Sequence, residues 1–131
     1  MNKINKNFLK SSHYIKDLKL CTIRLVDNSK FPWIILIPKR KNKTDITELN
    51  SKDQILLMKE IVICSKKMKK IFKTSKLNVE KIGNIISQLH IHIISRYRRD
   101  ESWPLSVWVI KGKAYSKKEL LNRINKLKKL I

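Results

Sequence analysis

The sequence predicts an α+β domain in which an antiparallel sheet is covered on one face by one long helix and a C-terminal helix. Apolar runs of strand length lie on both sides of a single long stretch with helical periodicity, and a second helical stretch follows them. With 131 residues, of which 42% are apolar, the chain is expected to form one domain over residues 1–131 around one core.

Four strands are predicted. Residues 20–26 (LCTIRLV) alternate in polarity, and after a turn at 27–30, residues 31–38 (FPWIILIP) form a continuous apolar run bounded by prolines. Such a run suits a strand that is buried on both faces. The other two strands are expected at 77–83 (LNVEKIG) and 89–95 (LHIHIIS).

Two helices are predicted from their start signals. Ser51 opens an S-x-x-Q capping pattern with Gln54, and residues of helical spacing follow it to about Lys73. A second capping pattern opens at Ser116 and precedes a basic helix over about 116–131. The periodic residues of the long helix are Ile55, Met58, Ile61, Val62, Ser65, Met68, Ile71 and Phe72.

The net charge of +21 suggests a polyanionic partner such as nucleic acid. The chain also contains 25 Lys, 20 Ile and 10 Asn, a combination typical of an AT-rich genome, and its lysines are scattered without interleaved aromatic residues. We therefore favour compositional drift over a selected nucleic-acid surface, which remains the alternative. In both cases the charge attracts anionic ligands over long range.

The chain has no stretch of about 18 apolar residues that would span a membrane. Its first 16 residues contain no apolar run that would serve as the core of a signal peptide. We expect a cytoplasmic protein without a membrane partner. Cys21 and Cys64 lie far apart with no CxxC pair, so they are interpreted as buried thiols.

Residues 88–94 read QLHIHII and contain two of the three histidines. Because side chains alternate along a strand, Gln88, His90 and His92 are expected on one face, about 6.5 to 7 Å apart along the chain. Metal binding, catalysis by a histidine, and two satisfied polar residues on an exposed face all fit this pattern. A zinc site lacks an evident third ligand, so no metal ligand is assigned.

The surrounding segment GNIISQLHIHII resembles the signature of the histidine triad (HIT) family. The resemblance covers about residues 13–110 and includes RLVDNSKFPWIILIPKR, LNVEKIGN and RDESWPLSVW. The chain looks like a bacterial subgroup with a Gln-x-His-x-His motif, whose members are described as diadenosine tetraphosphate hydrolase-like. This resemblance implies the HIT-like α+β fold, a nucleotide substrate and a homodimer.

The resemblance also implies roles for the triad. His90 would attack the α-phosphorus of a nucleoside phosphoester, anhydride or phosphoramidate, and water would hydrolyse the nucleotidyl-histidine. Its second ring nitrogen would donate to a backbone carbonyl. His92 would contact phosphate oxygens, and Gln88 takes the first triad position. No metal cofactor is required by this mechanism, although Mg²⁺ can accompany a polyphosphate substrate.

Residues outside the triad are assigned in the same way. Asn84 takes the place of an amide that binds phosphate, and Gly83 leaves room for the ligand. Asp27 and Asn28 lie where the family contacts the ribose hydroxyls, but they also read as a simple turn. Basic residues that flank the strands either attract phosphate or form a solvated rim: Lys39, Arg40, Arg96, Arg98 and Arg99.

The tryptophans are interpreted separately. Core packing is expected for Trp33, whereas Trp103 and Trp108 fit a position over the site, a dimer contact or the core.

Gln88 cannot carry a proton at neutral pH. A nucleotide-binding module without turnover and a basic RNA-associated protein are therefore alternatives to the favoured enzyme, a HIT-family nucleotide hydrolase or nucleotidyl transferase that acts through His90.

Overall fold

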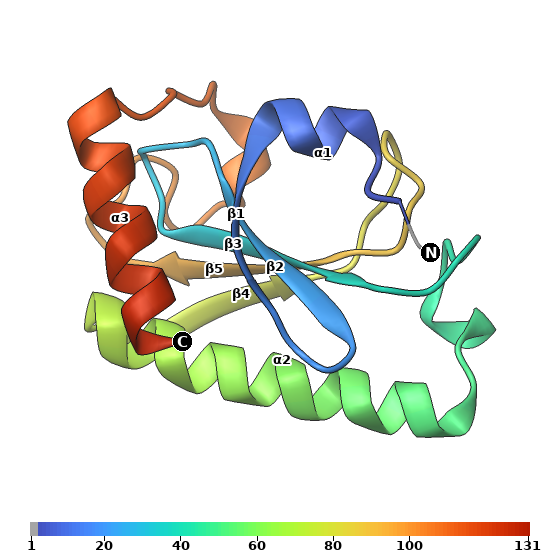
Figure 1. The fold of residues 1–131 in the computed structure, drawn as a ribbon. Helices are drawn as coiled ribbons and strands as arrows, with labels where there is room; N and C mark the ends of the chain where they lie inside the picture. Colours follow the sequence, from blue (N-terminus) through green and yellow to red (C-terminus); the bar gives the residue numbers. More distant parts are fainter. Residues whose placement is uncertain (1–2) are drawn as a thin grey trace.

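The computed structural model describes residues 3–131, which form a five-stranded sheet with helices on both of its faces (Figure 1). The elements in chain order are α1 (Lys6–Ser11), β1 (Ser12–Asp17), β2 (Cys21–Val26), β3 (Trp33–Pro38), the 3-10 turn η1 (Ile46–Glu48), α2 (Ser51–Phe72), β4 (Lys76–Glu80), β5 (Ile91–Arg96), the 3-10 turn η2 (Val107–Val109) and α3 (Lys117–Leu130). The predicted α+β class is confirmed.

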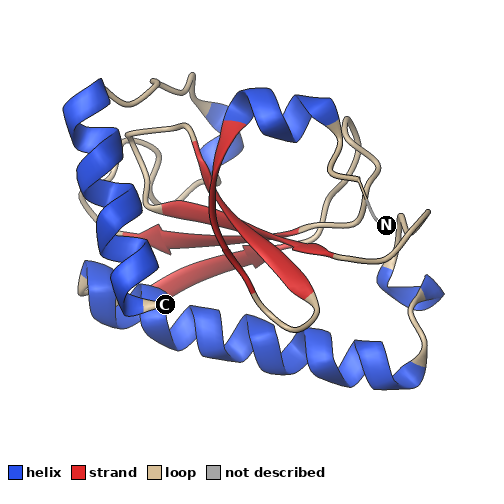
Figure 2. Cartoon of the chain, in the orientation of Figure 1, coloured by secondary structure: helices blue, strands red, loops and turns tan. Residues whose placement is uncertain are grey.

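The sheet has the strand order β1-β2-β3-β5-β4, and every neighbouring pair is antiparallel (Figure 2). All six residues of β3 are buried, as the apolar run at 31–38 predicts. His92 in β5 pairs with Ile35 in β3 on one side and with Glu80 in β4 on the other. The histidine strand is therefore an inner strand of the sheet.

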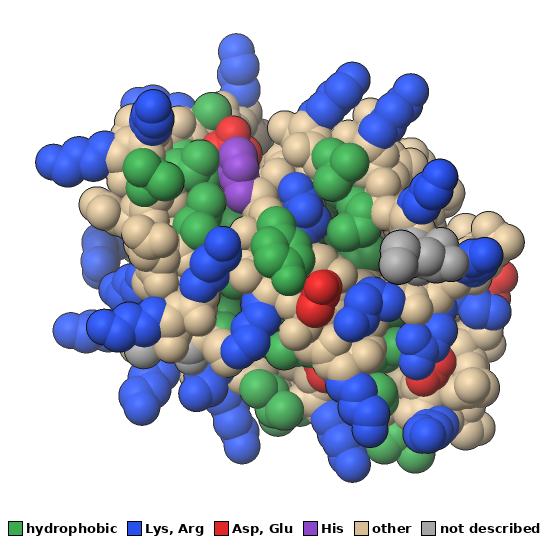
Figure 3. All heavy atoms as spheres, viewed as in Figure 1, with side chains coloured by type: hydrophobic (Ala, Val, Ile, Leu, Met, Phe, Trp, Pro, Cys, Tyr) green, Lys and Arg blue, Asp and Glu red, His purple; other side chains and the backbone are tan. Residues whose placement is uncertain are grey.

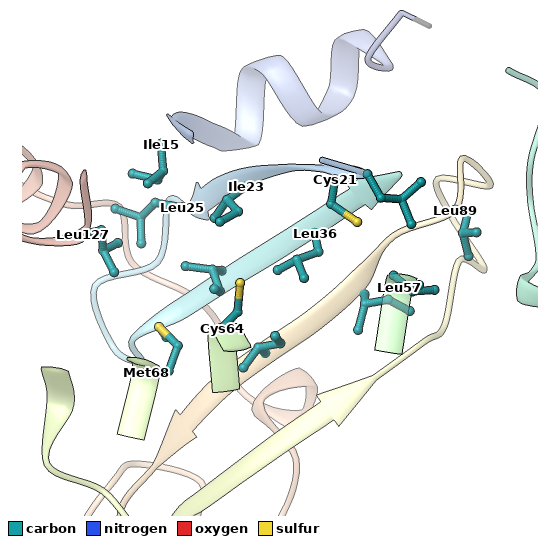
Figure 4. Close-up of a cluster of buried hydrophobic side chains, with 14 of the residues drawn as sticks. Ile15, Cys21, Ile23, Leu25, Leu36, Leu57, Cys64, Met68, Leu89 and Leu127 are labelled. Atoms are coloured by element: carbon teal, nitrogen blue, oxygen red, sulfur yellow. The ribbon is translucent and has the colours of Figure 1, made fainter. Parts of the chain in front are cut away.

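The main core lies on one face of the sheet, beneath α2 and α3. Leu57, Cys64 and Met68 of α2 project toward strand residues such as Leu36, and Leu127 of α3 completes the cluster (Figure 4). Burying large aliphatic side chains in this way is the main favourable contribution to folding. The two helices that the capping patterns predict are confirmed, and they share this face.

The buried side of α2 differs from the stripe that the sequence suggested. Ile55, Met58 and Val62 are exposed, at 59%, 60% and 42% of their surface, while Glu60 is buried. The Glu60 carboxylate accepts hydrogen bonds from two backbone N–H groups of the β1–β2 turn, those of Leu20 and Cys21, both at 2.8 Å. Because α2 has apolar residues on more than one side, this distant contact helps to decide which side faces the sheet.

The expectation that only one face is covered is wrong. Helix α1 and the segment 102–110 lie over the second face, where Phe8 packs on Ile35 and Ile37, and Val107 packs beside Trp33. The Asn5 side chain caps α1 by accepting the N–H of Asn7 at 2.8 Å. A six-residue helix is too short to show periodicity in a sequence, so α1 escaped prediction, as did the short strand β1.

Two remaining predictions concern cysteines and charge. Cys21 and Cys64 are buried free thiols, as expected. Lys and Arg side chains are spread over the visible surface without gathering in one patch (Figure 3). Within residues 3–131, no helix is both long and apolar enough to cross a membrane.

Candidate functional site

A cavity of about 400 Å³ opens on the second face of the sheet, between α1, the loop 82–86 and Trp108. His90 and His92 both line it, and each side chain is only about 5% exposed. Their ring centroids lie 4.7 Å apart in an edge-on arrangement. The two imidazoles therefore lie side by side, as predicted.

The hydrogen bonds of His90 assign its tautomer. Its Nδ1 lies 2.7 Å from the backbone carbonyl oxygen of Gln88, which can only accept. Nδ1 therefore carries the proton of the neutral ring, and Nε2 keeps a lone pair. Since His90 lines the cavity, Nε2 is the atom available to an electrophile there.

The neighbouring ring has the opposite tautomer. The indole N–H of Trp33 donates to Nδ1 of His92 at 3.0 Å, so the proton of a neutral His92 lies on Nε2. Trp33 is buried as expected, but no local pattern predicted this hydrogen bond. The two histidines thus present one lone pair and one N–H donor to the same cavity.

Both rings are held neutral at physiological pH. Burial lowers the pKa of His90 below its usual value, the hydrogen bond to Gln88 opposes this shift, and the positive charge of Lys81 adds to it. For His92, burial and the proximity of His90 lower the pKa to about 3. A neutral imidazole is the form that can act as a nucleophile.

The walls of the cavity are mainly aromatic and aliphatic. The Phe8 ring meets His90 edge-on at 4.6 Å, and the Trp108 ring meets His92 edge-on at 5.3 Å. Trp108 thus lies over the site, which was one of its three expected positions; its indole N–H donates to Glu80 at 2.7 Å. The aliphatic lining residues are Val26, Ile35, Ile82, Ile85 and Ile86.

A sequence model of the HIT domain matches residues 8–99. The chain belongs to the HIT domain family. A histidine triad protein from Bradyrhizobium japonicum is 34% identical and superposes with a TM-score of 0.94, covering 98% of this chain and 97% of that one. No curated protein sequence matches the chain significantly.

Two further solved HIT structures resemble the whole chain. A histidine triad protein from Sinorhizobium meliloti is 29% identical, with a TM-score of 0.95 and coverage of 99% of this chain and 97% of that one. A histidine triad protein from Marinobacter aquaeolei is also 29% identical, with a TM-score of 0.94 and coverage of 100% and 99%. The resemblance therefore extends to the C-terminal helix, beyond residues 13–110.

In this HIT protein the residue at the first triad position, Gln88, does not share one face with the two histidines, contrary to the prediction. The side chain of Gln88 does not line the histidine cavity. Its Oε1 accepts the backbone N–H of Asn5 at 2.8 Å, and its Nε2 donates to the carbonyl oxygen of Lys3 at 2.9 Å. The regular strand begins only at Ile91, so the alternation does not hold at Gln88.

Two predicted ribose contacts, Asp27 and Asn28, also lie outside the lining of the cavity. Asp27 accepts the backbone N–H of Tyr115 at 2.9 Å, and the Asn28 side chain packs closely against Gly112. These residues tie the turn after β2 to the segment that leads into α3. A ribose contact by either one remains a prediction that requires its side chain to turn toward the cavity.

The other predicted phosphate residues are placed in the loop before the histidines. Asn84 is exposed and lines the cavity, and Gly83 has a φ of 72°, a left-handed conformation that favours glycine. Trp103 and the basic residues of the strand ends do not line the cavity. Arg96 is instead buried against Asp100, with its Nε 2.8 Å from the carboxylate.

Metal binding gains no support from the geometry of the side chains. Within residues 3–131, no group of three or more His, Cys, Asp or Glu side chains is arranged to hold a metal ion.

The site residues that were not predicted from the sequence are Phe8, Trp33 in its role as a hydrogen-bond donor, and the isoleucines of the loop 82–86. An apolar loop directly after Gly83 was the one signal in the sequence for such a wall.

Proposed function

We propose that this HIT protein is a nucleotide hydrolase or nucleotidyl transferase that cleaves at the α-phosphate through a nucleotidyl-histidine on His90. One observation carries the proposal: a neutral His90 with its lone pair on Nε2 stands beside a neutral His92 with its proton on Nε2, in one cavity. A nucleophile and a donor for phosphate oxygens are the two groups that this reaction needs.

The reaction takes place in two displacements. His90 Nε2 attacks phosphorus, a P–N bond forms, and the bond to the leaving group breaks with its electron pair on the leaving atom. The imidazolium that results keeps its Nδ1–H on the Gln88 carbonyl, which stabilises the charge. Water then attacks phosphorus, the P–N bond returns its pair to Nε2, and one proton passes to solvent.

The cavity walls suit the rest of a nucleotide. The aliphatic and aromatic side chains offer an apolar surface to a nucleobase and exclude water from the phosphorus. Asn84, which lines the cavity, would donate to phosphate. No step requires a protein-bound metal, and Mg²⁺ would enter with a polyphosphate substrate.

Homodimer formation is part of the same proposal. Strand β4 is an edge of the sheet, and Val79 on it is 48% exposed. The exposed apolar residues Ile55, Met58 and Val62 lie on α2, which packs beside β4. The outer edge of a strand and an exposed apolar helix stripe together favour pairing with a second copy.

The test is single-turnover labelling of the protein with an adenylated substrate that carries a labelled α-phosphate. We expect a covalent adenylate in the wild type, its loss in His90→Ala, and its retention in the control His13→Ala, which removes a histidine outside the cavity. Nucleotide binding without label or turnover would support a binding module instead. Tight, salt-sensitive RNA binding that survives His90→Ala would support the RNA-associated alternative.

A further inference from the structure

The side chain of Gln88 and the lining of the histidine cavity bear on which substrates can react there. We propose that the site has no general acid for the leaving group, so that it cleaves nucleotides whose leaving group departs as a stable anion, such as phosphoanhydrides, in preference to phosphoramidates. This inference rests on the proposed function and narrows its substrate class.

The side chain of Gln88 makes its hydrogen bonds outside the histidine cavity. Both polar atoms of its amide are bonded to the backbone of the N-terminal segment, at Asn5 and Lys3. That segment continues into α1, whose Phe8 covers His90. Gln88 is therefore a positioning residue that fixes one wall of the cavity, and an amide has no proton to transfer at neutral pH.

His92 cannot become a charged acid without breaking its contact with Trp33. An indole N–H only donates, so a proton on Nδ1 of His92 would set two donors against each other. Its remaining proton on Nε2 belongs to a neutral ring, which is a very weak acid. His92 can donate a hydrogen bond to phosphate, but it does not release that proton to a departing group.

The remaining side chains of the cavity wall supply no acid either. Among the described residues, His90 and His92 are the only ionisable side chains on the cavity wall. His90 is the nucleophile, so it does not protonate the leaving group. The ammonium of Lys81 acts on His90 through its charge, but it lies outside the lining and is 3.6 Å from the Asp45 carboxylate.

These features distinguish leaving groups by their chemistry. When the P–O bond of an anhydride breaks, the electron pair remains on a phosphate oxygen, which is stable as an anion and needs no proton. When the P–N bond of a phosphoramidate breaks, the nitrogen must gain a proton as it leaves. General acid catalysis accelerates a reaction by about 100-fold to 10,000-fold. Its absence should therefore slow cleavage of the phosphoramidate.

The surroundings of the site suit an anionic leaving group. Gln88 itself lines a second hollow of about 520 Å³, whose lining includes Lys3, Lys41 and Lys43. None of these lysines forms an ion pair with a carboxylate of the described chain. The backbone N–H of Leu89 donates to the Lys43 carbonyl at 2.8 Å, which fixes this basic loop beside the triad segment.

The experiment uses three substrates that share adenosine 5′-phosphate: diadenosine tetraphosphate, the 4-nitrophenyl ester and the benzylamide. The rate of His90 adenylation is measured in single turnover, and binding is compared through inhibition constants. We expect the first two to react at least about 100-fold faster than the benzylamide, with inhibition constants that differ much less. In Gln88→Ala, all three rates should fall by the same factor.

Each outcome decides the inference. Benzylamide cleavage within about threefold of the anhydride would overturn it while leaving the proposed function intact, because His90 would still carry the adenylate. A changed ratio among the three rates in Gln88→Ala would also overturn it, since Gln88 would then act on the leaving group. Failure of all three substrates would overturn the proposed function together with the inference.

Discussion

Replacing Gln88 by alanine should loosen the N-terminal segment while the sheet stays folded. The substitution removes two hydrogen bonds to backbone groups, the N–H of Asn5 and the carbonyl of Lys3. At about 1 kcal/mol for each bond, the free energy of local opening falls by about 2 kcal/mol, which corresponds to a roughly 30-fold increase in the open population. Phe8 would then leave His90 more often.

Hydrogen exchange measures this opening directly. The amide of Asn5 donates to Gln88, so its exchange should accelerate about 30-fold in Gln88→Ala, whereas amides in β3 should be unchanged. Gln88→Glu keeps an acceptor for Asn5 but loses the donor to Lys3, so about half of the free-energy effect is expected. Ser87→Ala, at an exposed neighbour, is the control.

The reasoning fails if the Asn5 amide exchanges at the same rate in Gln88→Ala and in the wild type. It also fails if β3 loses protection to the same degree as Asn5, because the substitution would then act on global stability. A wall that opens should weaken nucleotide binding, so the Kd for an adenosine nucleotide should rise in Gln88→Ala and less in Gln88→Glu.

Three further outcomes follow from buried polar groups. Burial lowers the pKa of His92 from about 6.5 in the unfolded chain to about 3 in the folded chain. Between these two values the unfolded state binds more protons than the folded state. The free energy of unfolding should therefore fall by about 2 kcal/mol from pH 7 to pH 5. Urea titrations should show this slope in the wild type and a flatter one in His92→Asn. Trp33→Phe removes the donor to Nδ1, so the pKa of His92 should rise in an NMR titration, and an unchanged pKa would contradict the assigned tautomer. Glu60→Gln replaces one of two acceptors by a donor and should cost about 1–3 kcal/mol in the free energy of unfolding, whereas Glu101→Gln, at an exposed carboxylate, should cost little.

Much of the site could be inferred from local patterns. The i, i+2 spacing places His90 and His92 on one face and brings their rings together, although the predicted alternation does not extend back to Gln88. The fully apolar run at 31–38 favours an inner strand, and β3 is indeed the middle strand of the sheet. Ser116 caps α3 as its pattern predicts, whereas the cap of α2 is Asn50, one residue before the predicted Ser51, with its side chain accepting the N–H of Asp53.

Local patterns did not predict the contacts of side chains that have several possible partners. The long helix offers apolar residues on more than one side, and Asp27 and Asn28 read equally well as a turn or as ligand contacts. In the fold they bond or pack with residues 112–115, a segment whose position depends on where α3 docks. Of the predicted stripe of α2, Met68 and Ile71 are buried as expected, whereas Ile55, Met58 and Val62 were wrongly assigned to the buried side.

The sequence by itself therefore determined the α+β class, the family signature and the pairing of the two histidines, because each depends on residues a few positions apart. Only the tertiary structure decided the protonation and the surroundings of the site. The bonds of Gln88 to Asn5, Trp33 to His92 and Glu60 to Leu20 join residues 83, 59 and 40 positions apart. No local periodicity encodes such contacts, since they form only when separate elements pack together.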